Sequence, residues 1–108
     1  MQLLSSSQSK YLRGLAHSLK PVVLVGQKGV TPSVLESVRE ALGSHELIKV
    51  KFLDFKERGA KTQLADEIER RTGSRRVGLL GHVAIFYRPH PDPDKRKVIL
   101  PGPSSPPA

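Results

Sequence analysis

The residues with the most evident chemical use are Gln27 and Lys28, which stand between Gly26 and Gly29. Glycines permit positive φ and leave the backbone open to a ligand, and Lys28 adds a positive charge at the tip. The spacing excludes the phosphate-binding loop of nucleotide hydrolases, which has four residues between its glycines. It also excludes the dinucleotide fingerprint, because no Gly-x-Gly precedes the final glycine. This Gly-x-x-Gly segment therefore suits an anionic, elongated ligand, for which a nucleic-acid backbone is the natural candidate.

The neighbouring elements would place that loop at the start of a helix. Residues 22–25 form a short apolar run that is typical of a buried strand. Thr31 is a good helix N-cap, and Pro32 suits the first helical position. A helix that begins there offers N–H groups and the positive end of its dipole to an anion. A lone Gly-x-x-Gly is more often a simple turn, but this context favours the ligand interpretation.

The composition also favours an anionic partner. The chain has 108 residues, with 18 Lys and Arg against 10 Asp and Glu, and its net charge of +8 suits nucleic acid or an anionic surface. It has no cysteine, so disulfides, thiol catalysis and cysteine-based metal sites are excluded. No apolar run reaches the length of a membrane span, and residues 1–10 lack the apolar core of a signal peptide. We therefore expect a cytoplasmic monomer without membrane contact.

Hydrophobic periodicity predicts helices and strands in alternation over residues 1–89. A capping box at Ser5 and Gln8 opens the first helix, and apolar residues at helical spacing extend it to about Leu19. The other expected elements are a strand at 21–26, a helix at 32–42 with Gly43 just past its end, a strand at 46–53, a helix ending at Gly73, and strands at 75–80 and 82–88. The start of the third helix stays open, because residues 54–59 suit a helix cap and a loop equally well.

The order of these elements, α-β-α-β-α-β-β, predicts the architecture. Strands separated by a helix pair in parallel through right-handed crossovers, and the last two strands form a hairpin. We therefore expect residues 1–89 to form a single two-layer α/β domain with a small mixed sheet of four strands.

The chain after this domain has a different composition. From Pro89 to Ala108 it carries seven of its nine prolines, so residues 90–108 are expected to be a largely extended or disordered tail. Residues 97–100 are the exception, since they could add a short edge strand. The three basic residues at 95–97 are interpreted as a solvated segment rather than a localisation signal.

Several segments, taken together, resemble the YhbY-like CRM family, named after chloroplast RNA splicing and ribosome maturation. The matching segments are Leu-Arg-Gly-Leu-Ala-His at 12–17, residues 19–25, Gly-Gln-Lys-Gly-Val-Thr at 26–31, residues 45–51, Tyr-Arg-Pro at 87–89, and residues 97–101. The resemblance implies an RNA-binding module associated with large-subunit ribosome precursors. It also implies a fold related to the C-terminal domain of translation initiation factor three. Residues 54–59 and 78–80 fit the pattern loosely, and the segment after Pro101 is an addition.

Basic residues on the strands extend the candidate RNA site. Lys49 and Lys51 share one face of the strand at 46–53, which favours RNA contact over a merely solvated face. For the arginines that open the next strand, RNA contact and an ordinary charged strand entrance are evenly balanced. Aromatic residues make up only 5% of the chain, so backbone and shape recognition is favoured over base stacking. The candidate RNA contacts are Gly26, Gln27, Lys28, Gly29, Thr31, Lys49, Lys51, Arg75, Arg76 and Arg88.

No pattern indicates catalysis or a metal. The four histidines, at positions 17, 45, 82 and 90, lack metal-ligand spacing, and no nucleophile or paired-carboxylate motif stands out. We therefore expect no metal, no cofactor and no enzymatic activity. The expected function is binding of ribosomal RNA in large-subunit precursors. One alternative is a protein-interaction module that docks on an acidic ribosomal protein or assembly factor, and another is a small enzyme built from distant residues, for which the sequence offers no support.

Overall fold

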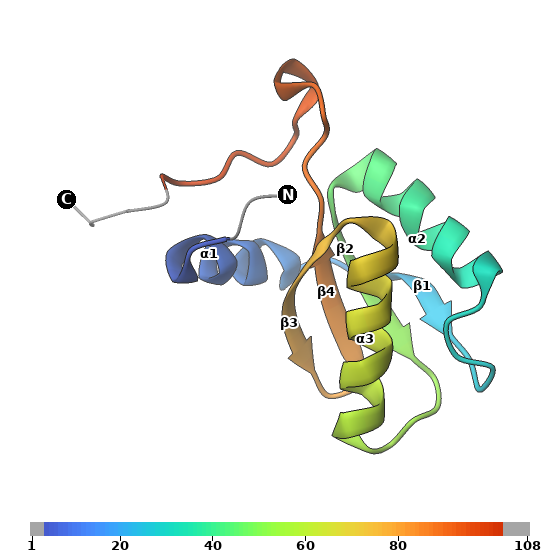
Figure 1. Cartoon of the computed structure of the whole chain (residues 1–108). Coiled ribbons are helices and arrows are strands. Elements are labelled where there is room, and N and C mark those ends of the chain that lie inside the picture. Colours follow the sequence, from blue (N-terminus) through green and yellow to red (C-terminus); the bar gives the residue numbers. More distant parts are fainter. Residues whose placement is uncertain (1–3, 103–108) are drawn as a thin grey trace.

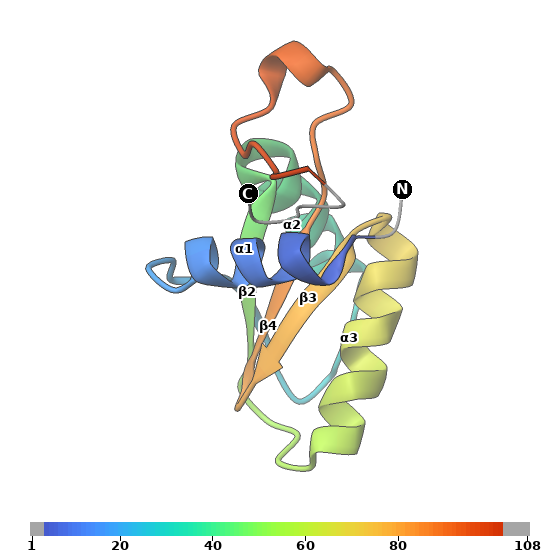
Figure 2. The same ribbon diagram turned by 90° about the vertical axis from the view of Figure 1, so that its left-hand side faces the viewer.

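A mixed sheet of four strands carries the fold, with helices on both of its faces (Figures 1 and 2). The computed structural model describes residues 4–102. Its elements are α1 (Ser6–Ala16), β1 (Pro21–Val25), α2 (Pro32–His45), β2 (Leu47–Phe52), α3 (Arg58–Thr72), β3 (Arg75–Leu80), β4 (Val83–Tyr87) and a short 3-10 helix, η1 (Pro93–Lys95). The strand order is β1-β2-β4-β3, with β1 parallel to β2 and the other pairs antiparallel. The predicted order of elements and the mixed sheet are confirmed.

The main hydrophobic core lies between the sheet and helices α2 and α3. Alternating residues of β1 and β2, among them Val25, Val50 and Phe52, turn their side chains toward this layer. They pack against the apolar stripe of α2, which includes Val38, and against Ile68 of α3. Alternation in the strands and helical spacing in α2 therefore meet in one layer, as the sequence pattern predicts.

Helix α1 crosses the opposite face of the sheet (Figure 2). Leu12 and Ala16 form a second core with one face of β2, β3 and β4, where Leu47, Val77, Ile85 and Tyr87 are buried. The predicted capping box opens this helix, since the Ser5 hydroxyl accepts a hydrogen bond from the Gln8 N–H and the Gln8 side chain accepts one from the Ser5 N–H. A third, partial layer thus covers part of that face.

The helix ends differ from the predicted ones where tertiary contacts decide them. Helix α2 continues through Gly43 and ends at His45, followed by Glu46 at a φ of +62°. Helix α3 begins at Arg58, after a loop that includes Glu57, and Glu57 provides no side-chain cap. Gly73 ends α3 at a φ of +70°, as predicted.

Residues 90–102, here called the strap, fold back over α1 instead of leaving the domain (Figures 1 and 2). Val98 and Leu100 pack against the second core, and the Gln8 amide donates a 2.9 Å hydrogen bond to the Pro101 carbonyl. Part of the predicted tail therefore packs against the predicted domain, and the domain boundary at residue 89 stays a prediction. Residues 1–3 of the predicted domain and 103–108 of the predicted tail lie outside the described residues.

The edge strand expected at 97–100 does not form, and the N–H groups of Lys97 and Val98 donate to Glu46 instead of to a strand. The Glu46 carboxylate is 2% exposed and accepts hydrogen bonds from the N–H groups of His90, Lys97 and Val98. Burial alone would raise the pKa of Glu46, but these hydrogen bonds and the charge of His90 outweigh it and hold the pKa below its ordinary value of 4.5. Glu46 is therefore a buried anchor for the strap.

Candidate nucleic-acid interface

The glycine loop, residues 26–29, is a tight turn with an exposed tip. The Gly29 N–H donates a 2.9 Å hydrogen bond to the Gly26 carbonyl, and Gln27 and Lys28 between them are exposed. Gly29 is buried at a φ of +75°, whereas Gly26 does not take a positive φ. A side chain at position 29 would be strained, so the turn itself requires this glycine.

The loop leads directly into the N-terminus of α2, as the sequence predicts. Thr31 is the N-cap, and its hydroxyl accepts a 3.1 Å hydrogen bond from the Val34 N–H. Pro32 follows at the first helical position. The positive end of the α2 dipole and the Lys28 ammonium are therefore close in the chain, on a segment whose tip residues, Gln27 and Lys28, are exposed.

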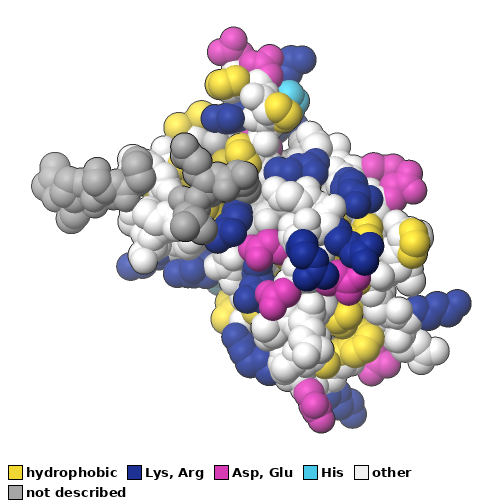
Figure 3. Space-filling model, in the orientation of Figure 1, with side chains coloured by type: hydrophobic (Ala, Val, Ile, Leu, Met, Phe, Trp, Pro, Cys, Tyr) yellow, Lys and Arg dark blue, Asp and Glu magenta, His cyan; other side chains and the backbone are white. Residues whose placement is uncertain are grey.

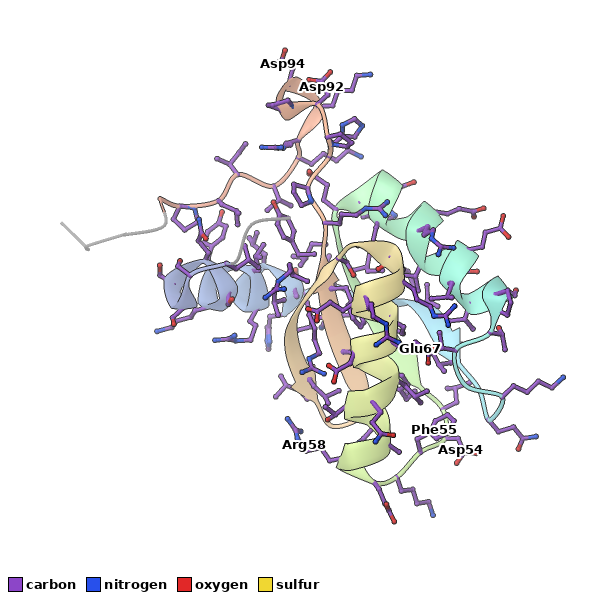
Figure 4. The ribbon with its side chains drawn as sticks, viewed as in Figure 1. Asp54, Phe55, Arg58, Glu67, Asp92 and Asp94 are labelled. Atoms are coloured by element: carbon purple, nitrogen blue, oxygen red, sulfur yellow. The ribbon has the colours of Figure 1, made fainter. Side chains whose placement is uncertain are left out.

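A second loop, residues 53–57, lies close to the glycine loop. Phe55 takes a φ of +66°, which is unusual for a residue with a side chain, and its half-buried ring lies against the main core and near Gly29. The Asp54 carboxylate accepts a 2.9 Å hydrogen bond from the Phe55 N–H. Figure 4 shows both residues on the loop that joins β2 to α3. The strained turn thus sends Phe55 inward and leaves Asp54 and Lys56 exposed.

Further cations lie at the same end of the sheet. The buried Lys61 ammonium donates a 2.6 Å hydrogen bond to the Gly81 carbonyl and lies 3.5 Å from the His82 Nδ1 atom. The Phe52 N–H donates to the His82 carbonyl at 2.8 Å, which ties the β3–β4 turn to the end of β2. The exposed lysines at this end are Lys28, Lys51 and Lys56, and we call them the basic end.

Sequence reasoning missed Lys56 as a member of this site. Its signal was present, because Lys56 and Arg58 flank the point where the third helix begins. Lys56 was not recognised because residues 54–59 could be assigned either to a loop or to the start of the helix. Because the start of α3 was not predicted, Lys56 could not be placed at the same end of the sheet as Lys51.

The structure assigns Lys49 a different role from the predicted one. Its ammonium donates hydrogen bonds to the carbonyls of Leu19, at 2.9 Å, and His17, at 3.4 Å, just past the last turn of α1. Its charge serves the C-terminal end of α1, so Lys51 is the better candidate for an RNA contact on this face, and that contact stays a prediction for both lysines. Lys51 lies two residues further on the same face and is exposed, with Leu24 and Val83 as its cross-strand neighbours.

Arg76 and Arg88 hold helices in place. The Arg76 guanidinium lies 3.0 Å from the Asp66 carboxylate on α3. The Arg88 guanidinium donates to the carbonyls of Thr72, at 2.8 Å, and Arg39, at 3.3 Å, and so bridges α3 and α2. These side chains reach carbonyls and a carboxylate on the helices, which argues against the predicted RNA contact for both.

Arg75 is half-buried and lies opposite Tyr87 in the strand register, on the face that α1 covers. Because β1, β2 and β3 run in the same direction, these arginines stand at the far end of the sheet from the glycine loop. The structure thus brings residues 26–31 together with Lys51 and separates them from Arg75, Arg76 and Arg88.

The outer face of α3 carries charges of both signs (Figures 3 and 4). Arg71 lies 3.2 Å from Glu67 one turn earlier, and Arg76 pairs with Asp66. The acids of α3 hold Arg71 and Arg76 in ion pairs, whereas Lys28 stands at the exposed tip of the glycine loop. The basic end therefore remains the better candidate for an RNA contact.

Two other kinds of site are absent from the described part of the chain. Among residues 4–102, no three His, Asp or Glu side chains come together in a way that could hold a metal ion. In the same range, no helix has the length and apolar character needed to cross a membrane.

Single substitutions should distinguish the role of Lys49 from the role of Lys51. Lys49→Ala removes two hydrogen bonds at the end of α1, so the free energy of unfolding should fall by about 1 kcal/mol. Lys51→Ala should leave that free energy within about 0.5 kcal/mol, because an exposed lysine contributes little to stability. It should weaken RNA binding several-fold, whereas Lys49→Ala should not. Urea titrations and RNA dissociation constants for both variants test this pair, and the reverse pattern would contradict it.

Comparisons with known proteins show what the chain is similar to. The family described as the CRS1 / YhbY (CRM) domain matches residues 4–88. A Haemophilus influenzae protein named "RNA-binding protein" is 41% identical over 101 residues, which are 94% of this chain and 98% of that protein. A Pseudomonas aeruginosa protein named "probable RNA-binding protein" is 40% identical over 85% of this chain and 88% of its own length. The solution structure of a hypothetical protein from Staphylococcus aureus superposes with a TM-score of 0.79 at 29% identity, covering 92% of this chain and all of that one.

Proposed function

This chain belongs to the CRS1/YhbY (CRM) domain family, and from that premise we propose that it binds RNA through the glycine loop and the basic end. The observation that carries the proposal is the exposed Gln27–Lys28 tip, held by Gly29 directly before the N-terminus of α2. The names of the related proteins describe RNA binding and no reaction, which supports a binding module rather than an enzyme.

The proposed mechanism rests on phosphate contacts. Lysines at the basic end neutralise phosphates and release counterions, which supplies affinity without sequence information. The glycine loop lets the RNA backbone approach the α2 N-terminus closely, where N–H groups and the helix dipole favour an anion. The turn is fixed by Gly29 and supported by Phe55, so little conformational entropy is lost when RNA binds.

Salt dependence tests this mechanism directly. About four to six phosphate contacts should give a slope of roughly −3 to −5 when the logarithm of the association constant is plotted against the logarithm of the salt concentration. Titrations of a structured RNA with an irregular or single-stranded region, at several salt concentrations, measure that slope. A slope close to zero would contradict the electrostatic mechanism.

We also propose that the bound RNA is ribosomal RNA in precursors of the large subunit, and that the protein acts in the cytoplasm as a monomer. The family resemblance supports the first part. Crosslinking in cells, followed by sequencing of the bound RNA, tests it. Reads concentrated on large-subunit precursor RNA are expected, and reads spread over unrelated transcripts would overturn the assignment.

One observation favours the alternative of a protein-interaction module. An apolar groove of about 450 Å³ lies between the end of α1 and the start of β1 and β2, at the other end of the sheet from the glycine loop. Leu15, Leu19 and Val22 line it, and so do Lys20 and His45, which suit an acidic partner with apolar side chains. Nuclease treatment of a ribosomal complex that contains this protein separates the two functions. RNA-mediated association is lost after treatment, whereas a protein-mediated association survives.

A further inference from the structure

A small cavity lies at the same end of the sheet as the glycine loop, and two of the basic-end lysines, Lys51 and Lys56, stand at its wall. Its volume is about 320 Å³, and it is lined by Lys51, Phe52, Leu53, Asp54, Lys56 and His82. These residues come from the end of β2, the loop after it and the β3–β4 turn. The volume lies near the lower limit of small-molecule pockets, which run from roughly 300 to 1,000 Å³, and so suits one base rather than a larger ligand.

Backbone hydrogen bonds hold the walls of this cavity in place. The Phe52 N–H donates to the His82 carbonyl at 2.8 Å, so two sides of the cavity are tied together. The Leu53 N–H donates to the Val25 carbonyl at 2.8 Å, one residue before the glycine loop begins. The cavity and the loop are therefore parts of one rigid surface, and RNA backbone held at the loop would place a neighbouring base within reach of the cavity.

The lining combines an acid with two lysines, which suits the mixed donors and acceptors of a base. Asp54 is the one acidic residue among the six lining residues, and it places a hydrogen-bond acceptor beside Lys51 and Lys56. The hydrogen bond from the Phe55 N–H fixes one carboxylate oxygen, which leaves the other for a ligand. A carboxylate held in this way suits the N–H donors on the edge of a base.

We propose that this cavity binds one unstacked guanine of the RNA, an inference that rests on the proposed RNA binding. Guanine offers N–H donors at N1 and N2 for the Asp54 carboxylate and acceptors at O6 and N7 for the ammonium groups of Lys51 and Lys56. Uracil offers a single N–H donor, and adenine has no acceptor at position 6. Guanine therefore matches both the acid and the bases of the lining.

Octamers of uridine that carry one central guanine, adenine, cytosine or uridine test this proposal by fluorescence polarisation. The guanine octamer should bind at least fivefold more tightly than the uridine octamer. An octamer with central inosine, which lacks the 2-amino group, should lose part of that preference. Asp54→Asn should reduce the preference to less than twofold, while the amide oxygen keeps the hydrogen bond to the Phe55 N–H.

Glu57→Gln is the matched control, because it removes the same charge three residues away from a side chain that is exposed and does not line the cavity. It should keep the guanine preference. Equal binding of all four octamers, tighter binding of adenine or cytosine, or a preference that survives Asp54→Asn would each overturn the guanine site while RNA binding itself stands. If no octamer binds even at low salt while the structured RNA of the salt titration does, the guanine site fails alone; if neither binds, the proposed function fails as well.

Discussion

Replacement of Gln27 and Lys28 together by Asp should weaken RNA binding at least tenfold, which equals roughly 1.4 kcal/mol. Both side chains are exposed at the tip of the glycine loop, so two carboxylates would face phosphate oxygens where Lys28 had attracted them. The turn depends on Gly29 and stays intact, and Asp is acceptable both in turns and near a helix N-terminus. The free energy of unfolding should therefore change by less than about 1 kcal/mol. RNA dissociation constants and thermal melting of the double variant measure the two effects.

The control for this experiment is the double variant Ser18→Asp and Lys20→Asp. It makes the same change in net charge at two exposed positions, just before β1 begins. The glycine loop follows the other end of that strand, so the control leaves the proposed contact untouched. It should reduce affinity only a few-fold, through the long-range field. Equal losses in both variants would show that net charge, and not the loop, governs binding.

Glu46→Ala should lower the free energy of unfolding by about 2–4 kcal/mol. The substitution removes the carboxylate that accepts hydrogen bonds from three N–H groups of the strap and leaves those groups without their partner. It should also loosen the packing of Val98 and Leu100 on the second core. Urea unfolding measures the loss, and amide hydrogen exchange at residues 97 and 98 shows whether the strap opens. A loss below about 0.5 kcal/mol would contradict the anchoring role.

The same carboxylate should make stability depend on pH. The pKa of Glu46 is lower in the folded chain than its ordinary value of 4.5, so the ionised form is favoured by folding. Its contribution is fully present above pH 4.5 and is lost as the pH falls toward and through the folded value. Glu46→Gln should flatten this part of the curve, whereas Glu40→Gln, at an exposed position of α2, should not.

Local chemistry explains which features could be predicted from the sequence. Thr31 and Pro32 cap α2 with groups that lie within three residues of their partners, and Gly29 takes the positive φ that a glycine permits. Alternation along the strands and helical spacing in α2 were sufficient to predict the order of elements and the mixed sheet. These signals depend on neighbours in the sequence, so one sequence is enough to detect them.

Long-range contacts explain the rest. Alternation places Lys49 on the correct face, but not beside the end of α1, 30 residues earlier. Arg88 reaches carbonyls on two helices, and no local pattern distinguishes that from a contact with RNA. The prolines after residue 89 indicated an extended tail, whereas the strap is held by Glu46, between 44 and 52 residues away. No local sequence pattern indicates a hydrogen-bond partner that lies so far away in the chain.

The anchoring of the strap also determines the order in which parts of the fold can form during translation. A nascent chain that has reached Tyr87 already contains every strand of the sheet, yet the amides that bind Glu46 have not been made. The Gln8 amide can donate its hydrogen bond to the Pro101 carbonyl only after Pro101, 93 residues later, has been made. The sheet can therefore assemble during translation. The strap cannot pack on the second core until residues 97–101 have left the ribosomal tunnel. Until then, the apolar groups beneath the strap are open to chaperones, and a chain stalled before residue 97 should be a chaperone client.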